Sequence, residues 1–143
     1  MKIIVLVGLP GSGKSTIVKE YIEKGFVWVN QDTLGSRDAC VALAKEAIEN
    51  GKDVIIDRCN TDIRQRRTWL NLAKYYNIKD VECINVTTEA RECYRRACER
   101  KEHPTIKNLT TTKIYGIIKS FDKGYEPPTF EEGFTKITIW ENI

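Results

Sequence analysis

The sequence has a single histidine and no cysteine pair with the spacing of a metal site. His103 stands directly before Pro104, which favours a loop residue over a catalytic acid or base. The five cysteines are an odd set without a CxxC pair, at Cys40, Cys59, Cys83, Cys93 and Cys98. Zinc sites use closely spaced ligands, and disulfide frameworks use an even number of cysteines. We therefore expect neither, and we expect a reducing intracellular compartment, the cytoplasm or the nucleus.

Long apolar runs and a strong excess of one charge are also missing. No stretch approaches the ~18 apolar residues of a membrane span, so we expect no membrane association. The short apolar run near the N-terminus leads at once into glycine and proline and then a charged helix, which favours a strand over a signal peptide. Lys and Arg total 23 against 20 Asp and Glu, and a net charge of +3 does not by itself indicate a nucleic-acid partner.

Strand-like apolar runs alternate with amphipathic segments of helix length along the chain. The predicted strands are KIIVLVG, FVWVN, KDVIIDR, VECINV and KITIW, and the predicted helices are SGKSTIVKEYIEK, RDACVALAKEAIEN, DIRQRRTWLNLAKYY, TEARECYRRACERK and about 110–121. Continuous apolar strands separated by helices predict a parallel sheet with helices on both faces. The 143 residues suffice for one such unit. We therefore expect one α/β doubly wound domain over residues 1–143, and a monomer.

A glycine-rich motif follows the first predicted strand. GLPGSGKST matches the phosphate-loop pattern GxxxxGK[ST] at Gly8, Gly13, Lys14 and Ser15. The glycines let backbone N–H groups point at phosphate oxygens, and the lysine reaches the β- and γ-phosphates of a nucleoside triphosphate. A turn that is glycine-rich by chance would lack the strand before it and the helix after it. We predict an ATP or GTP site formed by Gly8, Gly11, Ser12, Gly13, Lys14, Ser15 and Thr16.

The third predicted strand ends in VIID, which places Asp57 at the carboxyl edge of the sheet. Ligands of open α/β sheets bind at that edge, and a carboxylate there can hold a magnesium-bound water. The Ser15 hydroxyl would bind the same ion. The alternative, that Asp57 caps the next helix, is weaker because Asp62 is better placed for capping. We therefore expect Mg²⁺ at Ser15 and Asp57.

Asp32 stands at the end of the second predicted strand, in VNQDTLGSR, and faces the same crevice. A kinase needs a base for the acceptor hydroxyl, whereas a switch or motor needs a residue that orients water. The carboxyl end of a strand is a suitable place for such a base. By position alone, Asp32 could equally be a turn residue or a helix cap. Its assignment as a base therefore depends on the rest of the chain.

The fourth predicted helix is rich in arginine, with Arg91, Arg95, Arg96 and Arg100. Arg96 and Arg100 share a helix face at i,i+4 spacing. On a lid, they could stabilise the charge of a transferring phosphoryl group and close the site against water. The helix also offers ordinary ion pairs, Glu92 with Arg96 and Arg95 with Glu99, so a solvated salt-bridged face remains an alternative. We expect the lid role for Arg96 and Arg100 rather than for the other two arginines.

Several stretches together resemble a known family. They are GLPGSGKST, VNQDTLGSR, VIIDRCN, YRRACER and the tail YGIIKSFDKGYEPPTFEEGF. In order and spacing they are similar to the kinase domain of eukaryotic polynucleotide 5′-kinase/3′-phosphatases and related nucleic-acid-repair kinase modules, nearly from end to end. The resemblance implies a P-loop kinase-type fold and ATP-dependent phosphorylation of a 5′-hydroxyl end on DNA or RNA.

The same resemblance implies roles for individual residues in the chemistry. Asp32 resembles the general base of the family for the 5′-hydroxyl group. Lys14 and Ser15 correspond to its phosphate and magnesium contacts, and Arg96 and Arg100 to its lid arginines. The chain has no DxDG phosphatase signature, so the resemblance implies the kinase activity alone.

On the acceptor side the resemblance is looser. Asn60 falls on the asparagine of the DxxN stretch of the family, and Arg37 lies near the position that holds the substrate phosphate in its members. Gln31 stands where the family often has an arginine before the aspartate, and Arg58 and Cys59 separate Asp57 from Asn60. These departures concern the substrate contacts more than the chemistry. The resemblance thus implies substrate binding by Asp32, Arg37 and Asn60.

A polynucleotide substrate needs a basic groove and often an aromatic platform for a base. The segment RCNTDIRQRRTW offers the arginines Arg58, Arg64, Arg66 and Arg67, followed by Trp69. On a helix, Trp69 recurs with Ile63, Leu70 and Ala73, which favours a core position over base stacking. The outer arginines could equally be solvated. The residues therefore support an acceptor hydroxyl better than the polymer that carries it.

Two other functions remain open at this point. A small-molecule P-loop kinase would explain the modest net charge and the weak nucleic-acid face. A non-catalytic ATP-binding interaction module would bind nucleotide without transfer. The leading hypothesis is a polynucleotide 5′-hydroxyl kinase, because the paired aspartates and the lid arginines are present and the resemblance to that family runs nearly from end to end.

Overall fold

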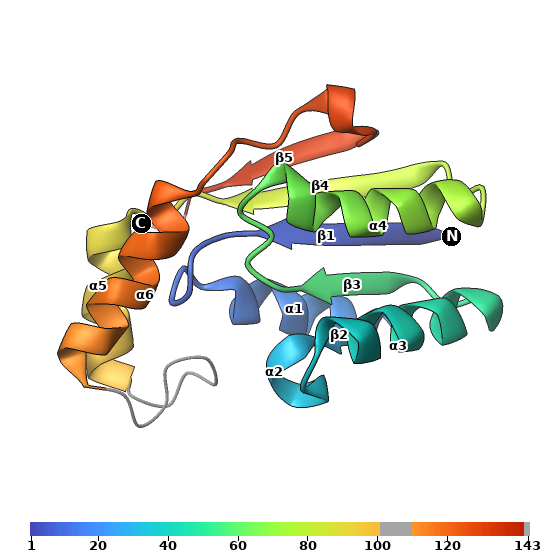
Figure 1. Ribbon diagram of the computed structural model, residues 1–143. Helices are drawn as coiled ribbons and strands as arrows, with labels where there is room; N and C mark the ends of the chain where they lie inside the picture. The colour runs from blue at the N-terminus through green and yellow to red at the C-terminus, as the bar shows by residue number, and fades with distance from the viewer. Residues whose placement is uncertain (101–109, 142–143) are drawn as a thin grey trace.

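The computed structural model describes residues 1–100 and 110–141, which form a parallel sheet flanked by helices (Figure 1). The strands are β1 (Lys2–Val7), β2 (Val27–Asn30), β3 (Val54–Asp57), β4 (Asp80–Val86) and β5 (Lys136–Trp140). The helices are α1 (Lys14–Glu23), α2 (Gln31–Leu34), α3 (Arg37–Glu49), α4 (Ile63–Tyr75), α5 (Ala90–Arg100), α6 (Thr111–Lys123) and the 3₁₀ turn η1 (Phe130–Glu132). Each predicted strand and helix is confirmed, whereas α2 and η1 were not predicted.

The sheet has the strand order β2-β3-β1-β4-β5, and every neighbouring pair is parallel. This is the predicted doubly wound arrangement. The strand that leads into the phosphate loop, β1, is central, and the chain order reverses around it. In such sheets, ligands bind outside the carboxyl ends of the strands at the point of reversal. The topology therefore brings the ends of β1, β2 and β3 to one edge.

The core forms two layers because alternate side chains of the central strands face opposite sides of the sheet. Helices α3 and α4 cover one face, and α1 covers the other (Figure 1). Ile3, Val5 and Val7 pack on the α3/α4 side, whereas Ile4 and Leu6 pack against α1. The α3/α4 layer also contains Trp69, which is completely buried, so the predicted core position of this residue is confirmed.

Helices α5 and α6 lie side by side beyond the carboxyl ends of the strands (Figure 1). They share a third apolar cluster, which contains Cys93 of α5, Ile114 and Ile118 of α6, and Leu9 of the phosphate loop. The arginine-rich helix is therefore packed against the loop that it was expected to cover. The loop position predicted for His103 lies outside the described residues.

The ends of several helices follow local sequence signals. The carboxylate of Asp62 accepts a hydrogen bond from the backbone N–H of Gln65 at 2.8 Å and caps α4, as predicted. Gly25 and Gly51 follow α1 and α3 with positive φ angles of 94° and 74°, a conformation that favours glycine after a helix. Across residues 1–100 and 110–141, no helix combines the length and apolar character that a membrane crossing requires.

Candidate active site

The phosphate loop connects β1 to α1 and depends on glycine at defined positions. Gly11 and Gly13 have φ angles of 81° and 100°, in the region that disfavours residues with a Cβ atom. A Cβ at Gly11 would also lie 2.8 Å from the carbonyl oxygen of Cys93 in α5. At Gly8 a Cβ would lie 2.6 Å from Oγ of Ser12. The loop is therefore wound tightly and closely approached by α5.

Lys14, the first residue of α1, points back into this loop. Its Nζ donates hydrogen bonds to the carbonyl oxygens of Gly8 at 2.7 Å and Leu9 at 2.9 Å, and the residue is only 8% exposed. The next two residues, Ser15 and Thr16, are exposed at the N-terminus of the helix. The positive end of the α1 dipole, the lysine ammonium and two hydroxyl groups thus converge at one place, which is a suitable environment for phosphate.

Asp57 lies at the end of β3 and is held there by two residues of β2. Its Oδ2 accepts hydrogen bonds from Nε1 of Trp28 at 2.8 Å and from Nδ2 of Asn30 at 2.9 Å. Among the described residues no group of three Asp, Glu, His or Cys lies together. An ion at Asp57 would therefore take most of its ligands from water and phosphate, as Mg²⁺ does. The described donor set fits Mg²⁺ rather than zinc.

Asp32 is exposed and belongs to the short helix α2, directly after β2. The residue that caps this helix is Asn30, whose Oδ1 accepts hydrogen bonds from the backbone N–H of Thr33 at 2.9 Å and from its hydroxyl at 3.1 Å. Asn30 thus contacts both Asp57 and the turn that carries Asp32. Sequence reasoning did not identify Trp28 or Asn30. The available signal was the alternation in VWVN, which puts both residues on the same face of the strand.

Cys59 shows that the predicted residues gather in one place. Burial raises the pKa of its thiol, the ammonium of Lys14 lowers it, and the carboxylates of Asp32 and Asp57 raise it. Arg58 also lowers it. The thiol sulfur lies 3.9 Å from Nζ of Lys14. Lys14 of α1, Asp32 of α2 and Asp57 of β3 therefore all lie near enough to Cys59 to influence its thiol.

Two arginines lie on the Asp32 side of this edge. Arg37 is exposed in the first turn of α3, and Arg58 is partly buried directly after β3. Burial lowers the pKa of Arg58, and the positive charge of Arg37 lowers it further, while the carboxylate of Asp32 acts in the opposite direction. The buried Nη1 of Arg58 has no hydrogen-bond partner within the described residues. This pair of cations therefore offers a surface for an anion next to Asp32.

Asn60 is completely buried and has an unusual backbone conformation, with a φ of 48°. Its Nδ2 donates to the carbonyl oxygen of Leu6 at 2.8 Å, and its Oδ1 accepts from Nε1 of Trp69 at 3.2 Å. These contacts tie the segment after β3 to the core strand β1 and to α4. In the structure, Asn60 thus stabilises the segment that follows β3. Its contact with substrate stays a prediction.

The arginine-rich helix α5 and the segment directly before it contact the phosphate loop. The hydroxyl of Thr88 donates to the carbonyl oxygen of Ser12 at 2.8 Å, and Cys93 packs against the loop. Burial raises the pKa of Cys93 to about 11, whereas Lys14 and Arg96 lower it. The side chain of Arg96 is 13% exposed. The side chain of Arg96 is therefore mostly buried and close enough to Cys93 to influence its thiol, and its lid role stays a prediction.

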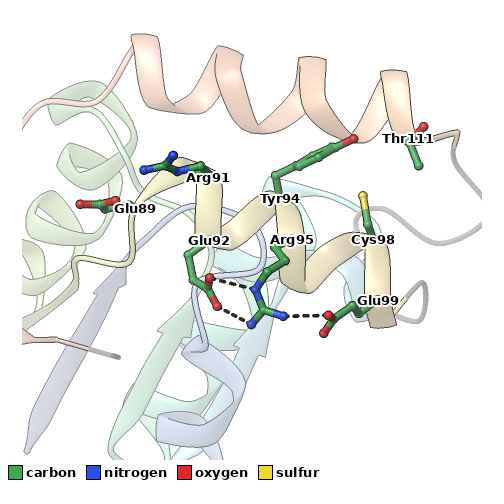
Figure 2. Close-up of a pocket in the computed structure, with 8 residues that line it drawn as sticks. All are labelled: Glu89, Arg91, Glu92, Tyr94, Arg95, Cys98, Glu99 and Thr111. Carbon is green, nitrogen blue, oxygen red and sulfur yellow. Dashed lines mark hydrogen bonds and ion pairs between the residues drawn. The ribbon is translucent and has the colours of Figure 1, made fainter.

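Helix α5 carries both ion pairs that the sequence offered as the alternative to a lid. Nη1 of Arg95 lies 2.7 Å from Oε1 of Glu99, and Nε of Arg96 lies 3.0 Å from Oε1 of Glu92. Arg95 also binds Glu92 and belongs to the lining of a pocket formed mainly by residues of α5 (Figure 2). The carboxylates thus engage Arg95 on the exposed face. Arg100 ends α5, and its side chain lies outside the described part of the structure.

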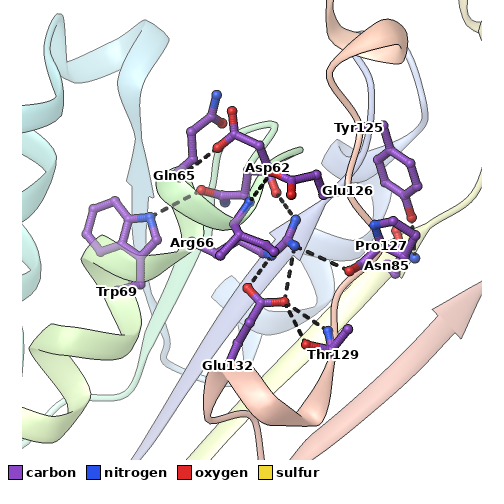
Figure 3. A network of polar contacts seen from close by, with 12 residues as sticks. Asp62, Gln65, Arg66, Trp69, Asn85, Tyr125, Glu126, Pro127, Thr129 and Glu132 are labelled. Carbon is purple, nitrogen blue, oxygen red and sulfur yellow. Dashed lines mark hydrogen bonds and ion pairs between the residues drawn. The ribbon is translucent and has the colours of Figure 1, made fainter.

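The expected nucleic-acid face must be corrected at Arg66. This side chain is completely buried, and its Nε and Nη2 donate to the two carboxylate oxygens of Glu132 at 2.8 and 3.1 Å (Figure 3). Further hydrogen bonds go to the carbonyl oxygens of Asn60 and Pro127. Arg66 lies on the helix side that contacts the tail around η1, so it cannot form part of a basic surface. Arg64 and Arg67 are exposed.

Comparison with known sequences gives consistent matches. The family model of the AAA domain matches residues 3–123. The bifunctional polynucleotide phosphatase/kinase of Schizosaccharomyces pombe (strain 972 / ATCC 24843) is 34% identical over 137 residues, which cover 95% of this chain and 32% of that protein. A relative from Acanthamoeba polyphaga mimivirus, whose name gives the same two activities, is 35% identical over 139 residues, with 95% and 32% covered. The chain thus spans about a third of the length of these curated relatives.

Solved structures confirm the fold. Kti12 of Chaetomium thermophilum, crystallised in complex with ADP-AlF3, has a TM-score of 0.72 at 18% identity and covers 97% of this chain and 88% of its own. The APS kinase CysC of Mycobacterium tuberculosis, in complex with AMPPNP and APS, has a TM-score of 0.62 at 20% identity, with 96% and 87% covered. The P-loop kinase-type doubly wound sheet expected from the sequence is therefore correct.

Proposed function

This chain belongs to the AAA domain family, whose model spans residues 3–123, and from that premise we propose that it is a polynucleotide 5′-hydroxyl kinase. It would transfer the γ-phosphoryl group of ATP to the 5′-hydroxyl end of DNA or RNA, in nucleic-acid repair. One observation carries the proposal. Asn30 hydrogen-bonds to both the Asp57 carboxylate and the turn that carries Asp32, so one side chain links the candidate metal ligand to the candidate base. The names of the two sequence relatives support the polynucleotide acceptor.

In the proposed reaction Lys14 leaves its two carbonyl acceptors and binds the β- and γ-phosphates. The Ser15 hydroxyl and, through water, the Asp57 carboxylate would hold Mg²⁺. When bound, this ion neutralises charge on the β- and γ-phosphate oxygens. Asp32 accepts the proton of the acceptor hydroxyl, and the resulting oxygen attacks the γ-phosphorus in line with the leaving ADP. The charge that spreads over the phosphoryl group is stabilised by Lys14 and by the lid arginines Arg96 and Arg100.

The acceptor side would be formed by Arg37, Arg58 and Asn60. Arg58 lies close enough to both Arg37 and Asp32 for electrostatic effects, and a guanidinium group binds a phosphate oxygen pair well. A phosphodiester next to the reacting 5′-hydroxyl group would satisfy both cations. Asn60 would contribute indirectly. Its Nδ2 donates hydrogen bonds to the carbonyl oxygens of Leu6 and Arg58 and so holds the backbone of this segment in place. An acceptor with a phosphate close to its hydroxyl group is therefore favoured over a neutral one.

The decisive experiment incubates the protein with γ-labelled ATP and magnesium against matched 5′-hydroxyl DNA and RNA oligonucleotides. Copies that already carry a 5′-phosphate serve as controls. We expect label on the 5′-hydroxyl strands only, and the rate ratio would give the preferred nucleic acid. Binding of ATP without transfer to either strand would contradict the proposal and would favour a non-catalytic ATP-binding module or another acceptor.

A small-molecule kinase of the same fold is the second candidate. It is favoured by one finding, that Arg66 is buried against Glu132 and cannot contribute to a basic groove. Binding of a polymer releases counterions and weakens steeply with salt, whereas binding of a compact metabolite depends on salt much less. Transfer that is insensitive to 50–200 mM salt, roughly the range over which polymer binding collapses, and that oligonucleotides do not compete, would support the small-molecule acceptor.

A further inference from the structure

Two side chains of β2 meet on one oxygen of Asp57. Trp28 and Asn30 are two residues apart, so they lie on the same face of the strand. The register of the parallel pair places Asn30 opposite Asp57. From there, Nδ2 of Asn30 and Nε1 of Trp28 both reach Oδ2 of the carboxylate, at 2.9 and 2.8 Å. Both distances lie within the usual range of N–H···O hydrogen bonds.

This arrangement orients the carboxylate group. Two donors on one oxygen fix the rotation of the group about its Cβ–Cγ bond. Among the described residues, the hydrogen bonds to the Asp57 side chain go to Oδ2, which leaves Oδ1 for an ion or its water. Residue Asp57 is 9% exposed, so few alternative donors from solvent compete for Oδ2. The carboxylate therefore presents a defined oxygen to an ion or its water.

Asn30 connects this carboxylate to the candidate base. While its Nδ2 donates to Asp57, its Oδ1 accepts from the N–H of Thr33, in the turn that carries Asp32. A rotation of the Asn30 amide would break both contacts together. The position of the metal carboxylate and the start of α2 are therefore mechanically coupled through one side chain.

We propose that Trp28 and Asn30 form a clamp that positions Asp57 for magnesium and couples it to the Asp32 turn. This inference rests on the proposed function, because it requires that Asp57 helps to hold Mg²⁺. Trp28 acts through Asp57 and not on the substrate. Residue Trp28 is 38% exposed on the edge strand β2, so its contribution to core packing is limited. The hydrogen bond to Asp57 is the contact that distinguishes this tryptophan from a phenylalanine.

The test measures the binding of a non-hydrolysable ATP analogue by calorimetry, with and without Mg²⁺. Trp28→Phe removes one donor to Asp57 and keeps an aromatic ring. Asn30→Ser removes the other donor and retains a hydroxyl that can cap α2. Asp57→Asn removes the carboxylate charge. Tyr75→Phe is the matched control, because this residue is 77% exposed at the far end of α4 and also loses one polar group.

We expect Mg²⁺ to strengthen binding of the analogue to the native protein and to the control alike. The gain should fall about 10-fold in Trp28→Phe and Asn30→Ser, the lower end of the range for residues that orient a metal ligand. Affinity in EDTA should change less than about twofold in either variant, since the phosphate loop is intact. In the Asp57→Asn background, Trp28→Phe should have no further effect on the gain, because the clamp acts through the carboxylate.

The outcomes separate this inference from the function on which it rests. If Mg²⁺ strengthens binding to the native protein, and Asp57→Asn abolishes the gain while Trp28→Phe and Asn30→Ser keep it, the clamp is refuted and the magnesium role stands. If Mg²⁺ does not affect the native protein, the magnesium role is wrong and the clamp fails with it. An equal loss of affinity with and without Mg²⁺ would indicate a purely structural role and would also overturn the clamp.

Discussion

The buried ion pair between Arg66 and Glu132 gives the sharpest prediction for stability. The two side chains are 0% and 7% exposed, and the guanidinium makes two parallel hydrogen bonds to the carboxylate. Glu132→Gln keeps the shape of the side chain but leaves the arginine charge buried without a counterion. The same carboxylate also accepts the backbone N–H of Thr129 at 2.9 Å, so it holds the turn η1 to α4 (Figure 3).

Removal of one partner of a buried pair typically costs about 3–5 kcal/mol. The glutamine oxygen can still accept one hydrogen bond, so we expect the lower end, a loss of about 3 kcal/mol in the free energy of unfolding. For a domain of this size, that corresponds to a fall in melting temperature of roughly 6–12 °C. On an Arg66→Met background the same substitution should cost about 1 kcal/mol or less, because no charge is then left unpaired.

Urea denaturation followed by circular dichroism measures these differences. Glu131→Gln is the matched control, since Glu131 is the exposed neighbour in the same turn and should change stability by about 0.5 kcal/mol or less. Equal effects of Glu131→Gln and Glu132→Gln would refute the reasoning. So would an unchanged cost of Glu132→Gln on the Arg66→Met background, because the penalty would then not come from the buried guanidinium.

Three further predictions concern the candidate base, the phosphate loop and the ion pairs of α5. Asp32→Asn should lower phosphoryl transfer by about 10²-fold or more, the typical effect of a lost general base, and leave binding of an ATP analogue nearly unchanged in calorimetry. Gly11→Ala should weaken analogue binding, because the left-handed φ of 81° disfavours alanine and the new Cβ would lie 2.8 Å from a carbonyl oxygen of α5. Hydrogen bonds from Arg95 and then Arg96 lower the pKa of Glu92 from 4.5 to about 2. These pairs should therefore stabilise the fold fully above pH 4.5 and be lost as pH falls towards 2, in pH-dependent thermal melts.

Each of these predictions has a control variant or an outcome that would contradict it. Loss of nucleotide binding in Asp32→Asn would contradict the assignment as a base. Gly116→Ala is the control for Gly11→Ala, because nothing lies within 4 Å of its Cβ position in α6 and the substitution should stabilise the helix slightly. Glu92→Gln should flatten the acid limb of the stability profile, and an unchanged limb would show that other carboxylates cause it.

Local signals in the sequence determined the elements and the phosphate loop. Period-two and period-3.6 patterns of apolar residues predict the strands and long helices, because burial of one face imposes these periods. The glycines of GLPGSGKST, the cap at Asp62 and the core position of Trp69 are likewise local consequences of backbone conformation and helix periodicity. Such features depend on neighbours within a few residues, so they can be recognised without the fold.

The partners of polar side chains were decided only by the tertiary structure. Arg66 and Arg67 are adjacent in an arginine-rich segment, yet the former is buried against a carboxylate 66 positions away and the latter is exposed. Likewise, Trp28 and Asn30 of β2 bind Asp57 of the neighbouring strand β3, although α2 and α3 separate the two strands in the chain. Hydrogen bonds and ion pairs depend on distances of about 3 Å between atoms. Those distances arise only when the strand order, the register and the packing of the tail are set, and no local pattern encodes them.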